Sequence, residues 1–217
     1  MQQLIEGVHH FQNIGFRQQQ ALFERLARGQ NPEACFITCS DSRIDPNLIT
    51  NAAPGQLFIV RNPGNVVPCY GTPNNSAMAA VEFAVAVLGV KDVILCGHNY
   101  CGAMKGVIHP ESIKELRTLT DWLHHCDSTA EIIKDHYHHL EGEDLYTVAA
   151  EENVLVQLEH LRSLPVIASR LSRGLINLHA WMYKIETGEV FVYESTVGQF
   201  KPLAEASQSP GVIQPAR

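Results

Sequence analysis

Two short segments of this sequence combine residue types that bind metal ions. The first is Cys39-Ser40-Asp41-Ser42-Arg43, and the second is His98-Asn99-Tyr100-Cys101. Two thiolates and one imidazole form a three-ligand set that suits zinc. His98 and Cys101 are close enough in sequence to bind one ion from a single turn, whereas Cys39 must be brought to them by the fold. Three protein ligands leave a fourth position open, which is typical of catalytic zinc sites.

Asp41 and Arg43 lie beside the first cysteine. Asp41 could reach the fourth position of the metal, and Arg43 could hold it as a paired carboxylate. Simpler interpretations exist, because a Cys-x-Asp-x-Arg stretch can be a capped turn with a surface ion pair, and an isolated His-x-x-Cys is common by chance. The remaining cysteines are expected to be packing residues: Cys35, Cys69, Cys96 and Cys126.

The elements that must position these residues follow from the hydrophobic pattern. Three short apolar runs that end in polar or glycine-containing turns are predicted to be buried strands: 35–39, 57–60 and 93–96. Helices are predicted over three segments: 76–88, 112–125 and 143–162. A hairpin is predicted from two segments: 175–183 and 190–193. Apolar strands separated by helices indicate an α/β fold with a central, mostly parallel β-sheet flanked by helices, in which chemistry lies beyond the carboxyl ends of the strands.

The chain is expected to have three parts. Apolar residues among the first 28 recur with helical spacing, which predicts an N-terminal helical arm over 1–30 that packs against another surface. A zinc-binding α/β domain is predicted over 31–200. A Pro-, Ser- and Gln-rich stretch follows Phe200, and it predicts a loosely held tail over 201–217.

Composition excludes several classes of protein. The chain has 217 residues, with 16 Lys and Arg against 23 Asp and Glu, and no basic run, which argues against a nucleic-acid partner. The longest apolar stretch, 77–90, contains Glu82 and Gly89 and is shorter than the roughly 20 residues of a membrane span. The N-terminus lacks the pattern of a signal peptide, and six cysteines are compatible with a reducing compartment, so a cytoplasmic location is expected.

The metal-binding segments and their surroundings resemble the β-class carbonic anhydrases. The similarity extends from about Leu22 to Glu194 and rests on four stretches in this order: Cys39-Ser40-Asp41-Ser42-Arg43, Arg61-Asn62, Gly97-His98 and Cys101-Gly102. Three further stretches resemble the cyanobacterial, carboxysome-associated members in particular: 45–50, 102–106 and 140–145.

The resemblance implies a site and an activity. Cys39, His98 and Cys101 would bind one zinc ion per chain, with Asp41 and Arg43 as the adjacent dyad. The reaction would be reversible hydration of carbon dioxide to bicarbonate and a proton by zinc-bound hydroxide, in support of inorganic carbon use. Members of the family are dimers or dimers of dimers whose N-terminal helices embrace the partner, so the arm is expected to pack on a partner subunit.

The resemblance also implies a substrate pocket. Gln30 matches a glutamine that reaches a neighbouring subunit's site, and Phe58 and Phe83 match aromatic positions that line the pocket, to which Gly102 also belongs. Met78 stands where the family normally has Gly or Ser. If the Met78 side chain points into the pocket, it would narrow the pocket. If the side chain instead packs against neighbouring helices, it has no effect on the substrate.

Two alternatives follow from this departure and from the carboxysome-type similarity. The first is hydrolysis of carbonyl sulfide or carbon disulfide on the same scaffold, with a pocket altered by Met78. The second is a weakly active, zinc-stabilised assembly protein that binds carboxysome shell or scaffold proteins. A carboxysomal location is accordingly the alternative to a purely cytoplasmic one.

Overall fold

The computed structural model describes residues 1–73 and 75–205. Contacts between Cα atoms divide the chain into two compact units, Met1–Asn31 and Pro32–Arg217. The end of the predicted tail, residues 206–217, lies outside the described residues.

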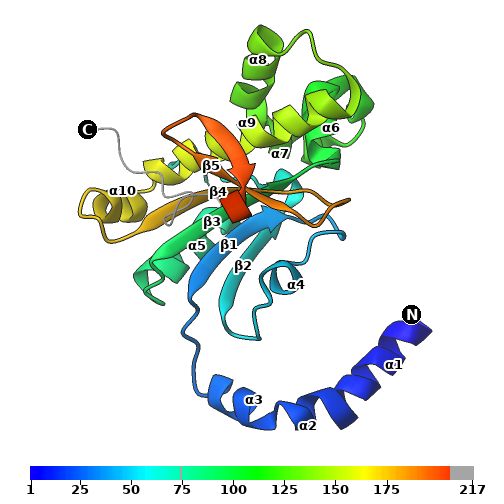
Figure 1. Cartoon of the computed structure of the whole chain (residues 1–217), viewed down its shortest axis with the longest axis vertical. Helices are drawn as coiled ribbons and strands as arrows, with labels where there is room; N and C mark the ends of the chain where they lie inside the picture. Colours follow the sequence, from blue (N-terminus) through cyan, green and yellow to red (C-terminus); the bar gives the residue numbers. More distant parts are fainter. Residues whose placement is uncertain (74, 206–217) are drawn as a thin grey trace. The chain divides into compact units, whose positions relative to one another are not determined.

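The N-terminal unit consists of short helical segments, shown in blue in Figure 1. They are α1 (Gln2–His10), a π-helical turn (Phe11–Gly15), α2 (Phe16–Gln18) and α3 (Gln20–Leu26). Three phenylalanine rings gather within it, with centroids 5.4–6.3 Å apart: Phe11, Phe16 and Phe23. None of the residues in these helical segments is buried. The helical character that the sequence predicts for the N-terminal segment is therefore confirmed, and large apolar side chains on it, such as Leu4 and Val8, are exposed.

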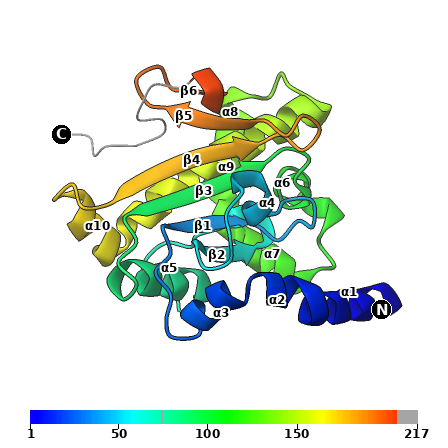
Figure 2. The same cartoon turned by 60° about the horizontal axis from the view of Figure 1, so that its bottom comes forward.

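The larger unit is built on a six-stranded sheet (Figures 1 and 2). Its strands are β1 (Ala34–Cys39), β2 (Leu57–Asn62), β3 (Asp92–His98), β4 (Asn177–Tyr183), β5 (Val190–Glu194) and β6 (Gln199–Pro202). The order is β2-β1-β3-β4-β5-β6, with parallel pairing from β2 to β4 and antiparallel pairing from β4 to β6. The prediction of a mostly parallel sheet is confirmed, and the predicted hairpin is the β4–β5 pair.

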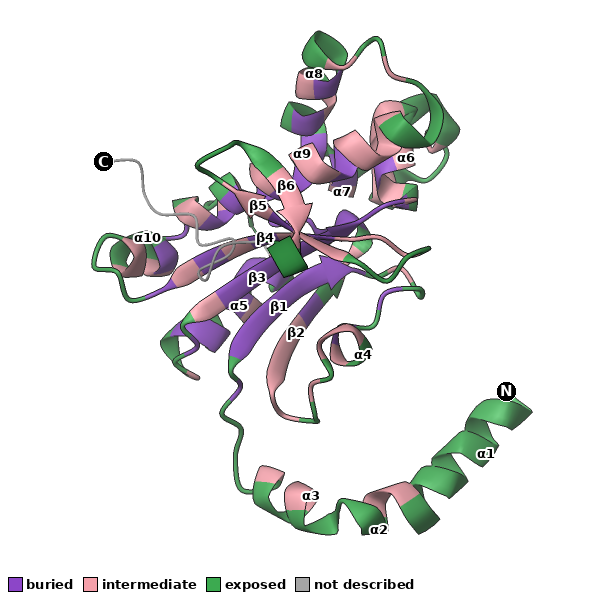
Figure 3. Cartoon of the chain, viewed as in Figure 1, coloured by how far each residue is buried: buried purple, intermediate pink, exposed green. Residues whose placement is uncertain are grey.

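Helices α5 (Ser76–Ala86) and α9 (Gly142–Ser163) pack against the sheet. Alternate residues of the buried strands belong to two clusters, as period-2 geometry requires: Ile37 lies in the large core and Phe36 in a smaller one. Strands β1 and β3 are accordingly almost wholly buried (Figure 3). This double burial explains why their sequences are continuous apolar runs.

Several shorter helices surround this core. They are α4 (Pro46–Thr50), α6 (Gly102–Ile108), α7 (Arg117–Leu123), α8 (Asp127–His136) and α10 (Pro165–Leu171). Asp45 caps α4 and Asn75 caps α5, each through side-chain oxygens that accept from backbone N–H groups. No helix among the described residues is both long and apolar enough to cross a membrane.

The structure differs from the sequence prediction in two segments. The helix predicted over 112–125 begins only at Arg117, after a 3-10 turn at Pro110–Ser112, and α8 follows it as a separate helix. Ile113 packs against α6 beside Gly106, so a tertiary contact replaces continued helix there. The predicted tail begins at residue 201, yet Lys201 and Pro202 pair with β5 as the end of β6.

We expect Gly97→Ala to destabilise the fold, because Gly97 lies in β3 where α9 crosses it. An added Cβ would meet Met182 Sδ and Val154 Cγ2 at 2.7 Å each. Overpacking of this kind costs about 1–3 kcal/mol, measurable as a lower midpoint of urea unfolding. Gly102→Ala is the matched control, since a Cβ there meets nothing within 4 Å. Equal stability of the two variants would contradict this account of the packing.

Candidate metal centre

Three metal-ligating side chains meet at the carboxyl ends of two adjacent strands. Cys39 ends β1 and His98 ends β3, and these strands pair in parallel at the centre of the sheet. Cys101 lies three residues after the end of β3 and directly precedes the first residue of α6. The ligand atoms of all three residues lie within 4.8 Å of one another, and all three residues are buried. The structure therefore brings together the ligand set that the sequence predicts.

The two sulfur atoms, of Cys39 and Cys101, are 4.0 Å apart. Two thiolates bound to one tetrahedral zinc, with Zn–S bonds of about 2.3 Å, stand about 3.8 Å apart, so this spacing suits a shared ion. A hydrogen bond from the Cys101 thiol lowers the pKa of Cys39. The same hydrogen bond raises the pKa of Cys101, and burial of the thiol raises it further. The pair can lose both protons only where a cation offsets two buried negative charges.

The imidazole of His98 is oriented by the backbone carbonyl group of the next residue, Asn99. The Nδ1–H of His98 donates a hydrogen bond to the carbonyl oxygen of Asn99 at 2.8 Å, and this tautomer leaves the lone pair on Nε2. The ring is fully buried, and its Nε2 atom has no hydrogen-bond partner among the described residues. An unpartnered acceptor beside two sulfurs is what a zinc ligand requires, so the donor set fits the metal in type, spacing and tautomer.

The predicted pair of Asp41 and Arg43 is formed. Arg43 Nε donates to Asp41 Oδ1 at 2.9 Å, and Arg43 Nη2 donates to Asp41 Oδ2 at 2.8 Å. Arg43 also donates to the carbonyl oxygen of Tyr100 at 3.0 Å, which ties the dyad to the segment that precedes Cys101. The bonds from Arg43 hold the pKa of Asp41 well below its usual range, so the carboxylate stays ionised. Its Oδ2 lies 3.9 Å from His98 Nε2 and therefore borders the metal centre.

Arg61 holds the loop that contains these residues, a role that sequence reasoning did not assign. Its Nε donates to the carbonyl oxygen of Cys39 at 3.1 Å, and its Nη2 donates to those of Asp41 at 2.7 Å and Ile44 at 3.0 Å. The signal in the sequence was the Arg61-Asn62 stretch that contributes to the resemblance, and the structure places Arg61 on β2 opposite Thr38, the residue before Cys39.

The predicted pocket residues are distributed over several elements. The rings of Phe58 and Phe83 contact each other with centroids 6.0 Å apart. Gly102 is the first residue of α6, next to Cys101, and is exposed. Gln30 belongs to the N-terminal unit and is exposed there. Its approach to a neighbouring subunit's site stays a prediction.

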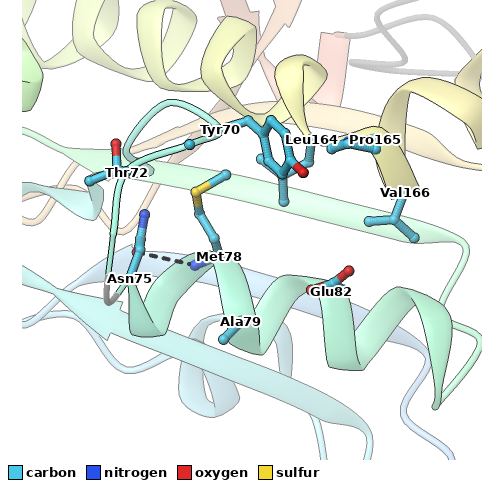
Figure 4. A pocket seen from close by; sticks show the side chains of 10 residues that line it. Tyr70, Thr72, Asn75, Met78, Ala79, Glu82, Leu164, Pro165 and Val166 are labelled. Atoms are coloured by element: carbon cyan, nitrogen blue, oxygen red, sulfur yellow. Dashed lines mark hydrogen bonds between the residues drawn. The ribbon is translucent and has the colours of Figure 1, made fainter.

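Met78 points into a different cavity, of about 360 Å³, seen in Figure 4. The side chain is 8% exposed and lies with those of Tyr70, Leu164 and Val166, between α5 and the start of α10. None of the three candidate zinc ligands lines this cavity. The position of Met78 thus fits the alternative in which this side chain packs between helices and leaves the substrate pocket unchanged.

Comparison with known proteins agrees with this geometry. The family model described as carbonic anhydrase matches residues 34–190. A carbonic anhydrase of Synechocystis is 48% identical over 201 residues, which cover 92% of this chain and 73% of the relative. A carbonic anhydrase of Synechococcus elongatus is 43% identical over 90% of this chain and 72% of the relative.

Solved structures show the same similarity in three dimensions. The β-carbonic anhydrase CcaA aligns with a TM-score of 0.94 and 46% identity, covering 98% of this chain and 95% of that one. The chain belongs to the β-class carbonic anhydrases. A structure from work on two tetrameric β-carbonic anhydrases of Sordaria macrospora aligns with a TM-score of 0.75 and 26% identity, covering 93% of this chain and 95% of that one.

This β-carbonic anhydrase is therefore a zinc enzyme that catalyses the reversible hydration of carbon dioxide. The expectation from the sequence is confirmed for the family, the enzyme class and the cofactor. The relatives, named as carbonic anhydrases, do not favour carbonyl sulfide or carbon disulfide hydrolysis, nor a mainly structural role for the zinc.

We expect Cys101→Ser to lose stoichiometric zinc and to lower the free energy of unfolding, because binding energy at such a site is also folding energy. Zinc per chain is measured by elemental analysis, and stability by thermal unfolding. Cys35→Ser is the matched control, since Cys35 is a fully buried thiol whose pKa burial raises to about 12. One zinc per chain retained in Cys101→Ser would show that Cys101 is not a ligand.

Proposed function

We propose that Cys39, His98 and Cys101 hold the catalytic zinc, and that Asp41, held by Arg43, orients the reacting hydroxyl group. The observation that supports this assignment is the meeting of the three buried ligand atoms within 4.8 Å, with the Asp41 carboxylate at their edge. Zinc, when bound, acts as a Lewis acid that lowers the pKa of water and so makes hydroxide available near neutral pH.

Asp41 acts as a hydrogen-bond acceptor in this proposal. Arg43 keeps the carboxylate ionised and fixes both of its oxygens, so its direction is set before substrate arrives. Asp41 accepts a hydrogen bond from the reacting hydroxyl group and thereby directs the oxygen lone pair at carbon. His98 keeps its ring in place through the bond from Nδ1 to the Asn99 carbonyl oxygen.

Carbon dioxide is uncharged and apolar, so its binding requires apolar surface and no ion pair. The contacting rings of Phe58 and Phe83 form an apolar surface of this kind, and Phe83 remains 43% exposed; within one chain Phe58 pairs with Cys35, four residues before Cys39. We propose these two rings, with Gly102 and a partner subunit's glutamine at position 30, as the wall of the substrate pocket.

We propose a homo-oligomer, a dimer or a dimer of dimers, in which the N-terminal arm packs on a partner subunit. The arm exposes a row of large apolar side chains that an isolated helix would not keep in water: Leu4, Ile5, Val8, Phe11 and Ile14. The tetrameric β-carbonic anhydrases of Sordaria macrospora support assembly in this family. A cytoplasmic location and recruitment to a carboxysome by shell or scaffold proteins stay predictions, supported by the likeness to cyanobacterial relatives.

We expect Asp41→Asn to lower kcat/KM by about 10²-fold while zinc content is unchanged, because a neutral amide orients the hydroxyl group less well. Stopped-flow measurement of proton release during carbon dioxide hydration checks this. Asp45→Asn is the charge-matched control, since Asp45 caps α4 and asparagine caps equally well. Full activity in Asp41→Asn would remove Asp41 from the mechanism.

We expect Val8→Glu to weaken assembly, because it places a charge on the apolar face of the arm that we assign to the partner subunit. Sedimentation equilibrium over a range of concentrations measures the dissociation constant, which we expect to rise at least about tenfold, or about 1.4 kcal/mol. Gln3→Glu adds the same charge on another side of α1 and serves as the control. Identical association of the two variants would argue against this surface.

A further inference from the structure

The turn after β2 contacts the first cysteine of the metal centre. This 3-10 turn, Pro63–Asn65, places the backbone N–H of Gly64 3.4 Å from Cys39 Sγ, to which it donates a hydrogen bond. Gly64 has φ +79, and a Cβ there would approach the Ala103 and Met104 side chains to 3.2 and 3.4 Å. The turn is thus packed tightly between β1 and α6, and its backbone N–H group bonds directly to the Cys39 sulfur.

A tryptophan binds the carbonyl oxygen of the peptide group that joins Pro63 to Gly64. Trp122, on α7, donates from Nε1 to the carbonyl oxygen of Pro63 at 2.8 Å. The Pro63 carbonyl and the Gly64 N–H belong to one planar peptide unit and point in opposite directions. A donor at the oxygen therefore fixes the direction of the N–H and also polarises it toward the sulfur.

A buried asparagine holds the next peptide group of the turn. Asn153, on α9 and 1% exposed, donates from Nδ2 to the carbonyl oxygen of Gly64 at 2.9 Å. Its Oδ1 accepts from Gln157 Nε2 at 3.1 Å and from Thr129 Oγ1 at 3.3 Å, so the amide cannot rotate freely. The turn is consequently fixed on both sides of Gly64 by two helices that contribute no candidate ligand.

We propose that Trp122 and Asn153 are positioning residues for the Cys39 thiolate. They aim the Gly64 N–H at the sulfur, and this bond withdraws electron density that Cys39 would otherwise donate to the metal. The inference rests on the proposed function in one respect, because it takes Cys39 as a ligand. It assigns control of the ligand's donor strength to side chains on α7 and α9, which do not touch the metal.

Two variants remove these donors while preserving shape. Trp122→Phe keeps an aromatic ring and loses the Nε1 proton, and Asn153→Asp keeps the acceptor oxygen for Gln157 and Thr129 while losing the amide donor. In protein loaded with Co(II), the sulfur-to-cobalt charge-transfer bands report thiolate donation. We expect both variants to shift these bands to longer wavelength. Competition with a chelator should show a loss of zinc affinity of about 10-fold or more, because the turn no longer holds the Cys39 sulfur in position and this loss outweighs the stronger donation.

Thr129→Val is the matched control. It removes a hydroxyl from the same buried polar cluster, because Thr129 is fully buried and bonded to Asn153. Both donors to the turn remain in place, because Gln157 Nε2 still donates to Asn153 Oδ1 and fixes the amide. Thr129→Val should lower stability without moving the charge-transfer bands. The inference is overturned if the charge-transfer bands of Trp122→Phe and Asn153→Asp shift no further than those of Thr129→Val. Trp122 is only half-buried, so its variant tests the idea even if Asn153→Asp does not fold.

Cys39→Ser separates this inference from the proposed function. If charge-transfer intensity is the same in wild type and Cys39→Ser, then Cys39 is not a ligand, and both proposals fail. If the intensity falls in Cys39→Ser while the bands of the two positioning variants match those of the control, then only the positioning inference fails.

Discussion

The close approach of two buried sulfur atoms is the constraint on which this structure depends. Cys39 and Cys101 are buried with their sulfur atoms 4.0 Å apart, and beside them lies His98 Nε2, which has no hydrogen-bond partner in the part of the chain that the structure describes. Such a cluster is unfavourable as two anions and is stable as a set of ligands around a divalent cation. A zinc ion held by these three residues, as we propose, would therefore stabilise the ends of β1 and β3, and the fold in turn would fix the chemistry that zinc supplies.

The loops of the site are held mainly through their backbone carbonyl groups. Arg61 binds three carbonyl oxygens of the segment 39–44, Arg43 binds that of Tyr100, and Trp122 and Asn153 bind those of Pro63 and Gly64. Donors of this kind leave the cysteine and histidine side chains free for the metal. They also limit movement of loops that would otherwise be the most mobile part of a parallel sheet.

The cavity around Met78 explains how the chain accommodates a large side chain where the resemblance implies Gly or Ser. The Met78 side chain extends toward Tyr70, in a cavity that Leu164 and Val166 also line. The cavity beside α5 accommodates the additional volume of the Met78 side chain. The contact between Phe58 and Phe83 involves a separate part of the same helix, so the change at position 78 does not require a change in that apolar wall.

The sequence by itself determined five of the six strands, the helical character of the N-terminal segment and the identity of the candidate metal-binding segments. Continuous apolar runs define β1 and β3 because both of their faces are buried, and Cys39, His98 and Cys101 follow at their ends. Only the tertiary structure decided which distant groups support those ligands. The contacts of Trp122 and Asn153 with the turn at Pro63–Asn65 join residues 59 and 89 positions apart. No local periodicity encodes such contacts, because a single hydrogen bond between packed helices and a loop depends on how the whole core is assembled.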